Sequence, residues 1–169
     1  MTKRLILGGG ALCAPLILLL MVAGNESGVA ASPDQPIAFS HRLHAGTLQF
    51  DCQFCHYQAR RASSAGVPSV RFCMGCHELI APDSPDIERL RDHRDRREPV
   101  VWTKIYDLPD HVVFSHQRHV QGNVECVECH GRVETMEIVE SPAQDLSMGW
   151  CIQCHRERSA SLDCLACHH

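Results

Sequence analysis

Apolar residues are concentrated near the N-terminus of the chain. Residues 5–23 carry no charge over 19 positions, and Lys3 and Arg4 precede them. A signal core spans roughly 7–15 residues and a membrane-spanning helix roughly 17–25, so this length favours an anchor. The triplet at residues 29–31 would also serve as a signal-peptidase site. Residues 1–31 are therefore a membrane anchor or a secretory signal.

The charges of this segment predict its orientation. Lys3 and Arg4 should remain in the cytoplasm while the rest of the chain is exported. Cys13 lies inside the apolar run, and Gly10 and Leu12 before it fit a lipoprotein cleavage site poorly. We therefore interpret Cys13 as a small membrane-facing residue rather than as a lipid-modified one.

After residue 31 the chain has no comparable apolar run, and apolar and polar residues are mixed. Few segments alternate between apolar and polar positions, as strands would. Residues 86–98 are rich in charge, include Ile87 and Leu90, and precede Pro99, which predicts a short solvated helix that ends before the proline. The sequence thus predicts a mainly α and irregular domain over residues 32–169.

Composition narrows the class of this domain. The chain has only five Phe, two Trp and two Tyr, fewer than a protein-only core of this size would usually hold. The net charge of −4 and the absence of a dominant basic stretch argue against nucleic acid as a partner. Eleven cysteines in 169 residues indicate disulfides, metal or a covalent cofactor.

Ten of the cysteines form five Cys-x-x-Cys pairs, and each pair is followed directly by His. The pairs are Cys52/Cys55, Cys73/Cys76, Cys126/Cys129, Cys151/Cys154 and Cys164/Cys167, and the histidines are His56, His77, His130, His155 and His168. This is the c-type haem attachment pattern. Two thiols at this spacing bond to the two vinyl groups of one porphyrin, and the following imidazole binds the iron as proximal ligand.

Zinc ribbons, disulfides and a thioredoxin-like motif are the alternatives. Histidine makes up 12 of 169 residues, so five chance occurrences after five pairs have a probability on the order of one in a million. Zinc ribbons would use the pairs two by two, which leaves one over and does not explain the histidines. We therefore predict five covalent haem c groups, numbered here in chain order, which form much of the domain core.

An internal repeat organises the domain. Phe39-Ser40-His41-Arg42-Leu43-His44 precedes site 1, and Phe114-Ser115-His116-Gln117-Arg118-His119 precedes site 3. Residues 69–72 and 147–150 precede sites 2 and 4 in a similar way. The domain therefore divides into two two-haem repeats, at about 37–80 and 112–158, followed by a fifth haem at 159–169.

The repeated segments also supply candidate distal ligands. His41/His44 and His116/His119 lie three residues apart, so each pair shares one helical face and could serve two neighbouring haems. The fifth distal ligand stays open between Met136, Met148, His111 and His169, since a Met ligand would raise the potential of its haem.

These motifs resemble a known family. The Phe-Ser-His-x-x-His segments are similar to those of class III multihaem cytochromes. The resemblance is closer to the pentahaem cytochrome subunit of alternative complex III, a bacterial quinol:electron-acceptor oxidoreductase. It rests on residues 41–56, 68–77, 102–119, 129–136 and 148–151, and it extends over nearly all of residues 37–169.

The resemblance implies a class III-like fold with one transmembrane helix and a haem domain on the periplasmic side of the bacterial inner membrane. It implies that the chain takes electrons from a quinol-oxidising assembly with an iron–sulfur subunit and passes them toward a cytochrome c or an oxidase. The chain would not be an enzyme by itself. The resemblance also implies mostly bis-histidine haems and one His/Met haem, for which Met136 is the preferred ligand.

Two other functions remain compatible with the sequence. One is a soluble periplasmic electron shuttle, which requires that residues 1–31 be removed. The other is a multihaem reductase with one open haem site, at which His93 or His111 would act as an acid or base.

Overall fold

The chain divides into two compact units, residues 1–31 and residues 32–169. The computed structural model describes residues 34–168, all within the second unit. The interpretations placed on residues 1–31, on Cys13 and on His169 therefore lie outside the described residues. Across residues 34–168, no helix combines the length and apolar character that crossing a membrane requires.

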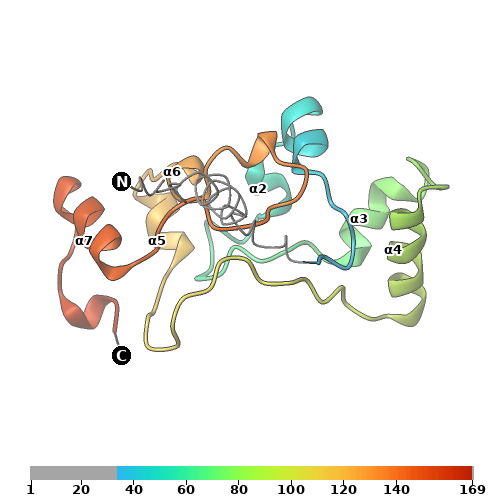
Figure 1. Cartoon of the computed structure of the whole chain (residues 1–169). Helices are drawn as coiled ribbons and strands as arrows, with labels where there is room; N and C mark the ends of the chain where they lie inside the picture. The colour runs from blue at the N-terminus through green and yellow to red at the C-terminus, as the bar shows by residue number, and fades with distance from the viewer. Residues whose placement is uncertain (1–33, 169) are drawn as a thin grey trace, which may run out of the picture. The chain divides into compact units, whose positions relative to one another are not determined.

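Short helices joined by loops make up the described residues, which contain no β-strand (Figure 1). The helices are η1 (Arg42–Thr47), α2 (Cys52–Cys55), α3 (Val70–His77), α4 (Pro85–Arg96), α5 (His116–Gln121), α6 (Cys126–His130), η2 (Val133–Thr135), α7 (Met148–Glu157) and η3 (Cys164–Ala166). The prediction of a mainly α and irregular fold is confirmed for this part of the chain. Figure 1 shows α3 and α4 at one end, α7 at the other, and α2, α5 and α6 between them.

Every Cys-x-x-Cys-His motif lies on a helix whose first turn is capped by a side chain. Asp51 and Asp163 precede the first cysteine of sites 1 and 5, and their carboxylates accept from the backbone N–H groups of Gln53 at 2.8 Å and Leu165 at 3.0 Å. At site 3, the Glu128 carboxylate accepts from the N–H of Glu125 at 2.8 Å. These caps fix the start of each turn and hence the direction in which the two thiols point.

At sites 2 and 4 the first cysteine lies one turn after the start of the helix. Ser69 and Ser147 lie four residues before Cys73 and Cys151, and their hydroxyls accept from the N–H groups of Phe72 and Trp150 at 3.4 Å. The two segments noted as similar in sequence therefore perform the same capping role, each in its own repeat.

A small apolar core joins α3 to α4. Ile37, Met74, Ile87 and Leu90 are buried together. The charge-rich segment predicted as a helix at 86–98 is α4, which begins at Pro85 and ends at Arg96, before Pro99. The predicted solvated helix is thus exposed on most of its surface, but its Ile87 and Leu90 pack on α3.

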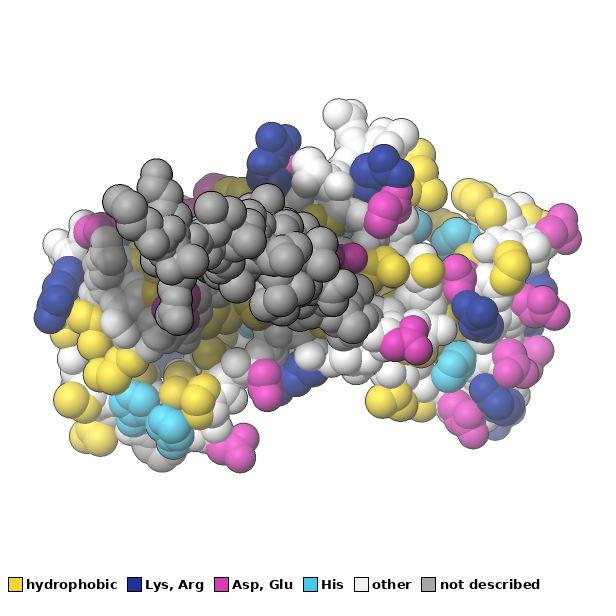
Figure 2. Space-filling model, in the orientation of Figure 1, with side chains coloured by type: hydrophobic (Ala, Val, Ile, Leu, Met, Phe, Trp, Pro, Cys, Tyr) yellow, Lys and Arg dark blue, Asp and Glu magenta, His cyan; other side chains and the backbone are white. Residues whose placement is uncertain are grey.

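Beyond this core the polypeptide buries very little. Ala59 is the one other buried hydrophobic residue within 34–168, and fifteen large hydrophobic residues are exposed. Figure 2 shows many hydrophobic side chains on the visible face. A chain this long normally buries a larger apolar core, so these side chains require apolar partners other than the polypeptide.

Two loops cross between the repeats in a reciprocal way. The N–H groups of His116 and Gln117 donate to the carbonyls of Ser63 and Ala62, at 2.9 and 3.1 Å. In the other direction, the N–H groups at positions 41 and 42 donate to the carbonyls at positions 137 and 136, at 3.3 and 2.7 Å. In both cases the accepting residues lie six and seven positions after the proximal histidine of the other repeat.

The contact between η1 and η2 depends on a glycine. A Cβ atom at Gly46 would lie 2.3 Å from the backbone carbonyl oxygen of Glu134, a distance that forces the two segments apart. We expect Gly46→Ala to lower the free energy of unfolding of the haem-loaded protein by about 1–3 kcal/mol. Guanidinium unfolding followed by circular dichroism measures the change.

Gly149→Ala is the matched control. Its Cβ would meet only the Ser147 hydroxyl at 3.9 Å, and it lies within α7, where alanine is favoured over glycine by about 0.5–1 kcal/mol. Equal unfolding midpoints for the two variants would show that the η1–η2 contact is not as tight as described.

Candidate functional site

All ten paired cysteines are described, and all ten are free thiols. Among residues 34–168, no group of three or more His, Cys, Asp or Glu side chains is arranged to hold a metal ion directly. The described part of the chain thus shows neither the disulfides nor the four-ligand clusters expected of the two structural alternatives. The cysteine pairs remain available for thioether bonds.

The thiols of different sites lie near one another in a definite order. Burial, and then the neighbouring Cys126 thiol, raises the pKa of Cys52, which relates site 1 to site 3. Burial and the Cys76 thiol raise the pKa of Cys55, which relates site 1 to site 2. Burial and the Cys154 thiol raise the pKa of Cys129, which relates site 3 to site 4. Burial and the Cys167 thiol raise the pKa of Cys151, which relates site 4 to site 5.

These proximities place the five attachment sites in the order 2, 1, 3, 4, 5. The same order follows the arrangement of α3, α2, α6 and α7 in Figure 1. Sites 2 and 5 are therefore the two ends of the series, although site 1 comes first in the chain.

The imidazoles are held by backbone carbonyls. Among the proximal histidines, the Nδ1 atoms of four lie 2.6–3.0 Å from a carbonyl oxygen: His56 with Gly66, His77 with Ile80, His155 with Ser161 and His168 with His111. A carbonyl oxygen can only accept, so Nδ1 carries the proton in each ring. The lone pair is then on Nε2, which is the arrangement a metal-binding imidazole requires.

Three of the predicted distal histidines are held in the same way. His44 and His119 donate from Nδ1 to the carbonyls of Ser40 and Ser115, both at 2.8 Å, and His116 donates to Ser63 at 2.9 Å. The serine of each Phe-Ser-His-x-x-His segment thus anchors the second histidine of its own segment.

Predicted distal and proximal histidines face one another in four pairs. The ring centroids are 6.1 Å apart for His44/His77, 6.2 Å for His116/His130, 6.1 Å for His119/His155 and 5.6 Å for His111/His168. Two imidazoles that bind opposite faces of one iron through bonds of about 2 Å have centroids roughly 6 Å apart. The four spacings therefore suit four irons held between the rings.

The two repeats share their aromatic geometry. The ring of Phe39 lies edge-on to His41 at 4.9 Å and stacks on His44 at 4.4 Å, and Phe114 does the same with His116 at 4.8 Å and His119 at 4.5 Å. His41 therefore has the position in the first repeat that His116 has in the second. By this correspondence His41 faces site 1, as His116 faces His130 of site 3.

The surroundings of His41 agree with this position. Burial lowers its pKa to about 4, and the charges of His56 and His44 contribute in the same direction. Its Nδ1 is buried and has no hydrogen-bond partner among the described residues. Burial and the nearby His116 also lower the pKa of His130. Both rings are thus neutral at physiological pH, as iron binding requires.

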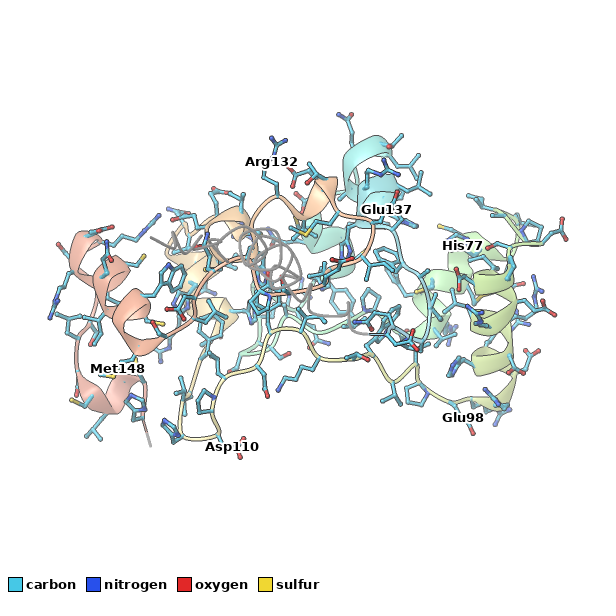
Figure 3. The ribbon with its side chains drawn as sticks, viewed as in Figure 1. His77, Glu98, Asp110, Arg132, Glu137 and Met148 are labelled. Carbon is cyan, nitrogen blue, oxygen red and sulfur yellow. The ribbon has the colours of Figure 1, made fainter. Side chains whose placement is uncertain are left out.

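Three candidate residues, Met136, Met148 and His93, do not belong to the four ring pairs. Met136 is partly buried, and its carbonyl accepts from the N–H of Arg42 at 2.7 Å. Met148 is the first residue of α7 and is exposed (Figure 3). His93 lies on α4 with its Nδ1 buried and, within residues 34–168, without a hydrogen-bond partner. His93 joins none of the four ring pairs.

The residues present fit c-type haem. The ten free thiols at the required spacing, the seven Nδ1-anchored rings and the four ring pairs match its covalent and axial bonds. The exposed hydrophobic side chains match its apolar faces. The sequence predicted the cysteines and histidines, but it gave no sign of the anchoring carbonyls of Ser63, Gly66 and Ser161, because a backbone acceptor carries no side-chain signature.

Comparison with known proteins agrees with this fit. Residues 112–169 match the family model of cytochrome c7 and related cytochrome c. Over 163 residues the chain is 26% identical to the multihaem cytochrome c subunit of menaquinone reductase from Nitratidesulfovibrio vulgaris (strain Hildenborough), an alignment that covers 80% of this chain and 77% of that protein. The chain is cytochrome c7-like. It is a multihaem c-type cytochrome that transfers electrons, which confirms the predictions of c-type haem and of electron transfer.

The ring pairs predict which substitution would leave a haem iron with an open coordination position. We expect His111→Ala to leave one haem without its sixth ligand, because His111 faces His168 across a spacing that suits iron. The haem at site 5 should become high-spin and bind carbon monoxide when reduced. Visible absorption and electron paramagnetic resonance measure both effects.

His93→Ala is the control, since His93 belongs to no ring pair and lies on α4. An unchanged low-spin spectrum in His111→Ala would assign the fifth distal position to another residue, such as His169, Met136 or Met148.

Proposed function

We propose that this chain is a pentahaem electron-transfer subunit of a membrane-bound quinone-linked oxidoreductase of the alternative complex III type. It would lie on the periplasmic side of the bacterial inner membrane and would not be an enzyme by itself. Its partners would be membrane subunits, including an iron–sulfur subunit, and an electron acceptor that is a cytochrome c or an oxidase.

The observation that carries the proposal is the set of facing imidazoles. Four proximal histidines each face a distal histidine. The internal repeat, and the effect of the His56 charge on the pKa of His41, support His41 as the partner of the fifth, His56. With both axial positions filled at every site, no iron would keep an open position for substrate. This favours electron transfer over the multihaem reductase.

The polypeptide determines the order of haem sites along which electrons would pass. Bound haems would supply one-electron carriers, and the polypeptide sets the order of their attachment sites as 2, 1, 3, 4, 5. His41 and His44 lie on one turn and connect sites 1 and 2, and His116 and His119 connect sites 3 and 4 in the same manner. Carbonyl anchors on the Nδ1 atoms of His44, His116 and His119 keep these three rings from rotating, which holds neighbouring sites at fixed separation.

The quinone link is supported by the related protein. The similar chain from Nitratidesulfovibrio vulgaris is by its name a subunit of a menaquinone reductase, and the alignment covers most of both chains. The proposal assigns electron transfer to this chain and quinone chemistry to partner subunits.

Purification from the native membrane tests the proposal. We expect five haems per polypeptide by pyridine haemochrome assay, a mass equal to the polypeptide plus five haem groups, and co-purifying membrane and iron–sulfur subunits. The reduced protein should bind carbon monoxide at well below one haem per chain, because each iron would have two axial ligands.

Each alternative has its own result in this experiment. A monomer without partner subunits whose polypeptide starts near residue 32 would indicate the soluble shuttle instead. Rapid carbon monoxide uptake by one haem would indicate the reductase. Zinc in place of iron, or a bare polypeptide mass, would contradict any assignment as a cytochrome.

The distal ligand of site 1 gives a sharper prediction. We propose His41 rather than Met136, because His41 has the position of His116 in the repeat. We expect His41→Ala to convert about one-fifth of the haem to the high-spin form, and Met136→Leu to leave the spectrum and all five potentials unchanged. A Met-to-iron absorption band that disappears in Met136→Leu would reverse this assignment.

A further inference from the structure

We propose that backbone carbonyls give the two central haem sites, 1 and 3, higher reduction potentials than the flanking sites 2 and 4. The boundary between the two repeats then holds the first two electrons that enter the chain. The inference rests on the proposed function, because it takes all four irons as bound by two histidines. It assigns an order of potentials that the proposed function leaves open.

Both rings of each flanking site are anchored, meaning that a carbonyl oxygen accepts from Nδ1. At site 2, the Nδ1 atoms of His77 and His44 lie 3.0 and 2.8 Å from carbonyl oxygens. At site 4, the corresponding distances are 2.7 Å for His155 and 2.8 Å for His119. Sites 2 and 4 therefore have two anchors each, in the same arrangement in both repeats.

Each central site has only one anchored ring. At site 1, the Nδ1 of His56 lies 2.6 Å from the carbonyl oxygen of Gly66, whereas the buried Nδ1 of His41 has no partner among the described residues. Site 3 has the opposite arrangement. Its distal ring, His116, is anchored at 2.9 Å, and its proximal ring, His130, has no carbonyl acceptor for Nδ1 in the part of the chain that the structure describes.

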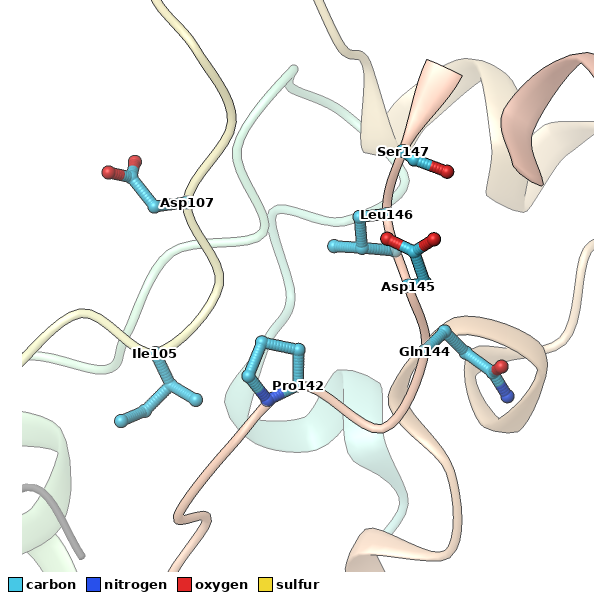
Figure 4. Close-up of a pocket in the computed structure, with 7 residues that line it drawn as sticks. All are labelled: Ile105, Asp107, Pro142, Gln144, Asp145, Leu146 and Ser147. Carbon is cyan, nitrogen blue, oxygen red and sulfur yellow. The ribbon is translucent and has the colours of Figure 1, made fainter. Parts of the chain in front are cut away.

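The ring of His130 is held by an aromatic neighbour instead. Tyr106 lies edge-on to it, with the ring centroids 4.5 Å apart. The Tyr106 hydroxyl donates to the carbonyl of His130 at 3.4 Å and accepts from the N–H of Ala143 at 3.2 Å. Tyr106 and Ala143 thereby join two segments whose other residues, including Ile105 and Pro142, line a hollow of about 400 Å³ (Figure 4). His130 is thus positioned by packing rather than by a carbonyl.

An anchor on Nδ1 favours the ferric state of the iron. The hydrogen bond draws the Nδ1 proton toward the carbonyl, so that Nε2 becomes a more basic ligand. A more basic ligand stabilises the more highly charged iron and so lowers the reduction potential. Two anchors therefore lower the potential more than one does. Site 5 also has one anchor, but His111 is exposed to water that can accept from its Nδ1, so the anchors alone do not rank site 5.

Charged side chains do not reverse this order. None is buried within residues 34–168, so all of them act on the irons through water, where salt screens charges over about 8 Å. Near site 3 they are also paired, Glu128 with Arg158 and Arg132 with Glu134. Hydrogen bonds made by the ligands themselves act on the iron without this screening.

One loop supplies both anchors of the central sites. Ser63 holds His116 of site 3, and Gly66, three residues later, holds His56 of site 1. Gly66 has a φ of +69°, which glycine adopts readily and a β-branched residue does not. A Cβ atom there would meet only the side chain of Gln58, at 3.6 Å or more, so backbone conformation rather than space is the constraint. Gly66 is therefore a positioning residue for the central pair.

The central sites together take two electrons. Each ferric iron accepts one electron and becomes ferrous, and no bond or proton changes place in this chain. A quinol-oxidising partner loses two electrons and releases its two protons outside this chain. Because the Cys52 thiol of site 1 lies beside the Cys126 thiol of site 3, the two reduced sites are neighbours.

The first test is a reductive titration of the full-length, haem-loaded protein, followed by proton NMR of the haem methyl groups. His41→Ala, His44→Ala, His116→Ala and His119→Ala each remove one axial ligand, so the signals that each variant changes identify one site. In wild type we expect sites 1 and 3 to be reduced before sites 2 and 4. The expected preference is roughly tenfold per electron, which corresponds to about 59 mV.

The second test compares Gly66→Val with Gly66→Asn. Valine strains the backbone at this φ and weakens the bond from His56 to the carbonyl of residue 66, whereas asparagine adopts the same φ and retains it. Gly66→Val should shift the one-electron equilibrium of site 1 roughly three- to tenfold further toward the ferrous state and leave sites 2 and 4 unchanged. Gly66→Asn should titrate as wild type does. A purely structural role for Gly66 would not single out the potential of site 1.

Three results would overturn the inference. They are reduction of site 2 or 4 before or together with the central sites, equal potentials of site 1 in the two Gly66 variants, and an equal shift at all four sites in Gly66→Val. The wild-type titration decides even if Gly66→Val does not load haem.

Electron paramagnetic resonance of the same samples separates the two proposals. Five low-spin bis-histidine haems reduced in another order would reject the order of potentials alone. A His/Met or high-spin haem at site 1, or fewer than five haems, would reject the proposed pentahaem electron-transfer chain and this inference with it.

Discussion

The hydrogen bond from an imidazole Nδ1 to a backbone carbonyl is the interaction on which this domain depends. Seven of the ten described histidines that we assign to iron make it. It fixes both the tautomer and the rotation of the ring, so that Nε2 points in one direction. Short helices and loops suffice as a scaffold because each needs only to deliver one carbonyl and one ring.

The same interaction explains how so little polypeptide positions so many rings. Four of the seven carbonyls come from loops that follow a haem motif, such as Gly66 after His56 and Ser161 after His155. Buried polypeptide side chains are few, and Ile37, Met74, Ile87 and Leu90 form the one cluster described. Order in this fold thus comes from capped turns and directional hydrogen bonds more than from a packed apolar interior.

Much of the site could be predicted from the sequence, because its chemistry is local. The spacing in Cys-x-x-Cys-His and the repeated Phe-Ser-His-x-x-His segments are short-range patterns, and the structure places His44, His116 and His119 opposite proximal rings. The partner of His168 could not be predicted. His111 lies 57 residues earlier, in a loop without a repeated counterpart, and only the fold brings the two rings together. The order 2, 1, 3, 4, 5 was equally hidden, because the contact between Cys52 and Cys126 is long-range.

The reciprocal loops between the repeats have a consequence for the ancestry of the fold. Residues 62 and 63 hold the histidine segment of the second repeat, and residues 136 and 137 hold that of the first, in matching positions. A lone repeat would leave its loop acceptors and its histidine segment without these bonds. Two identical copies would satisfy them for each other about a two-fold axis, as symmetric homodimers do. The present chain has the contacts of such a dimer fused into one polypeptide, which frees each half to diverge: the first could acquire α4, and the second a fifth Cys-x-x-Cys-His motif.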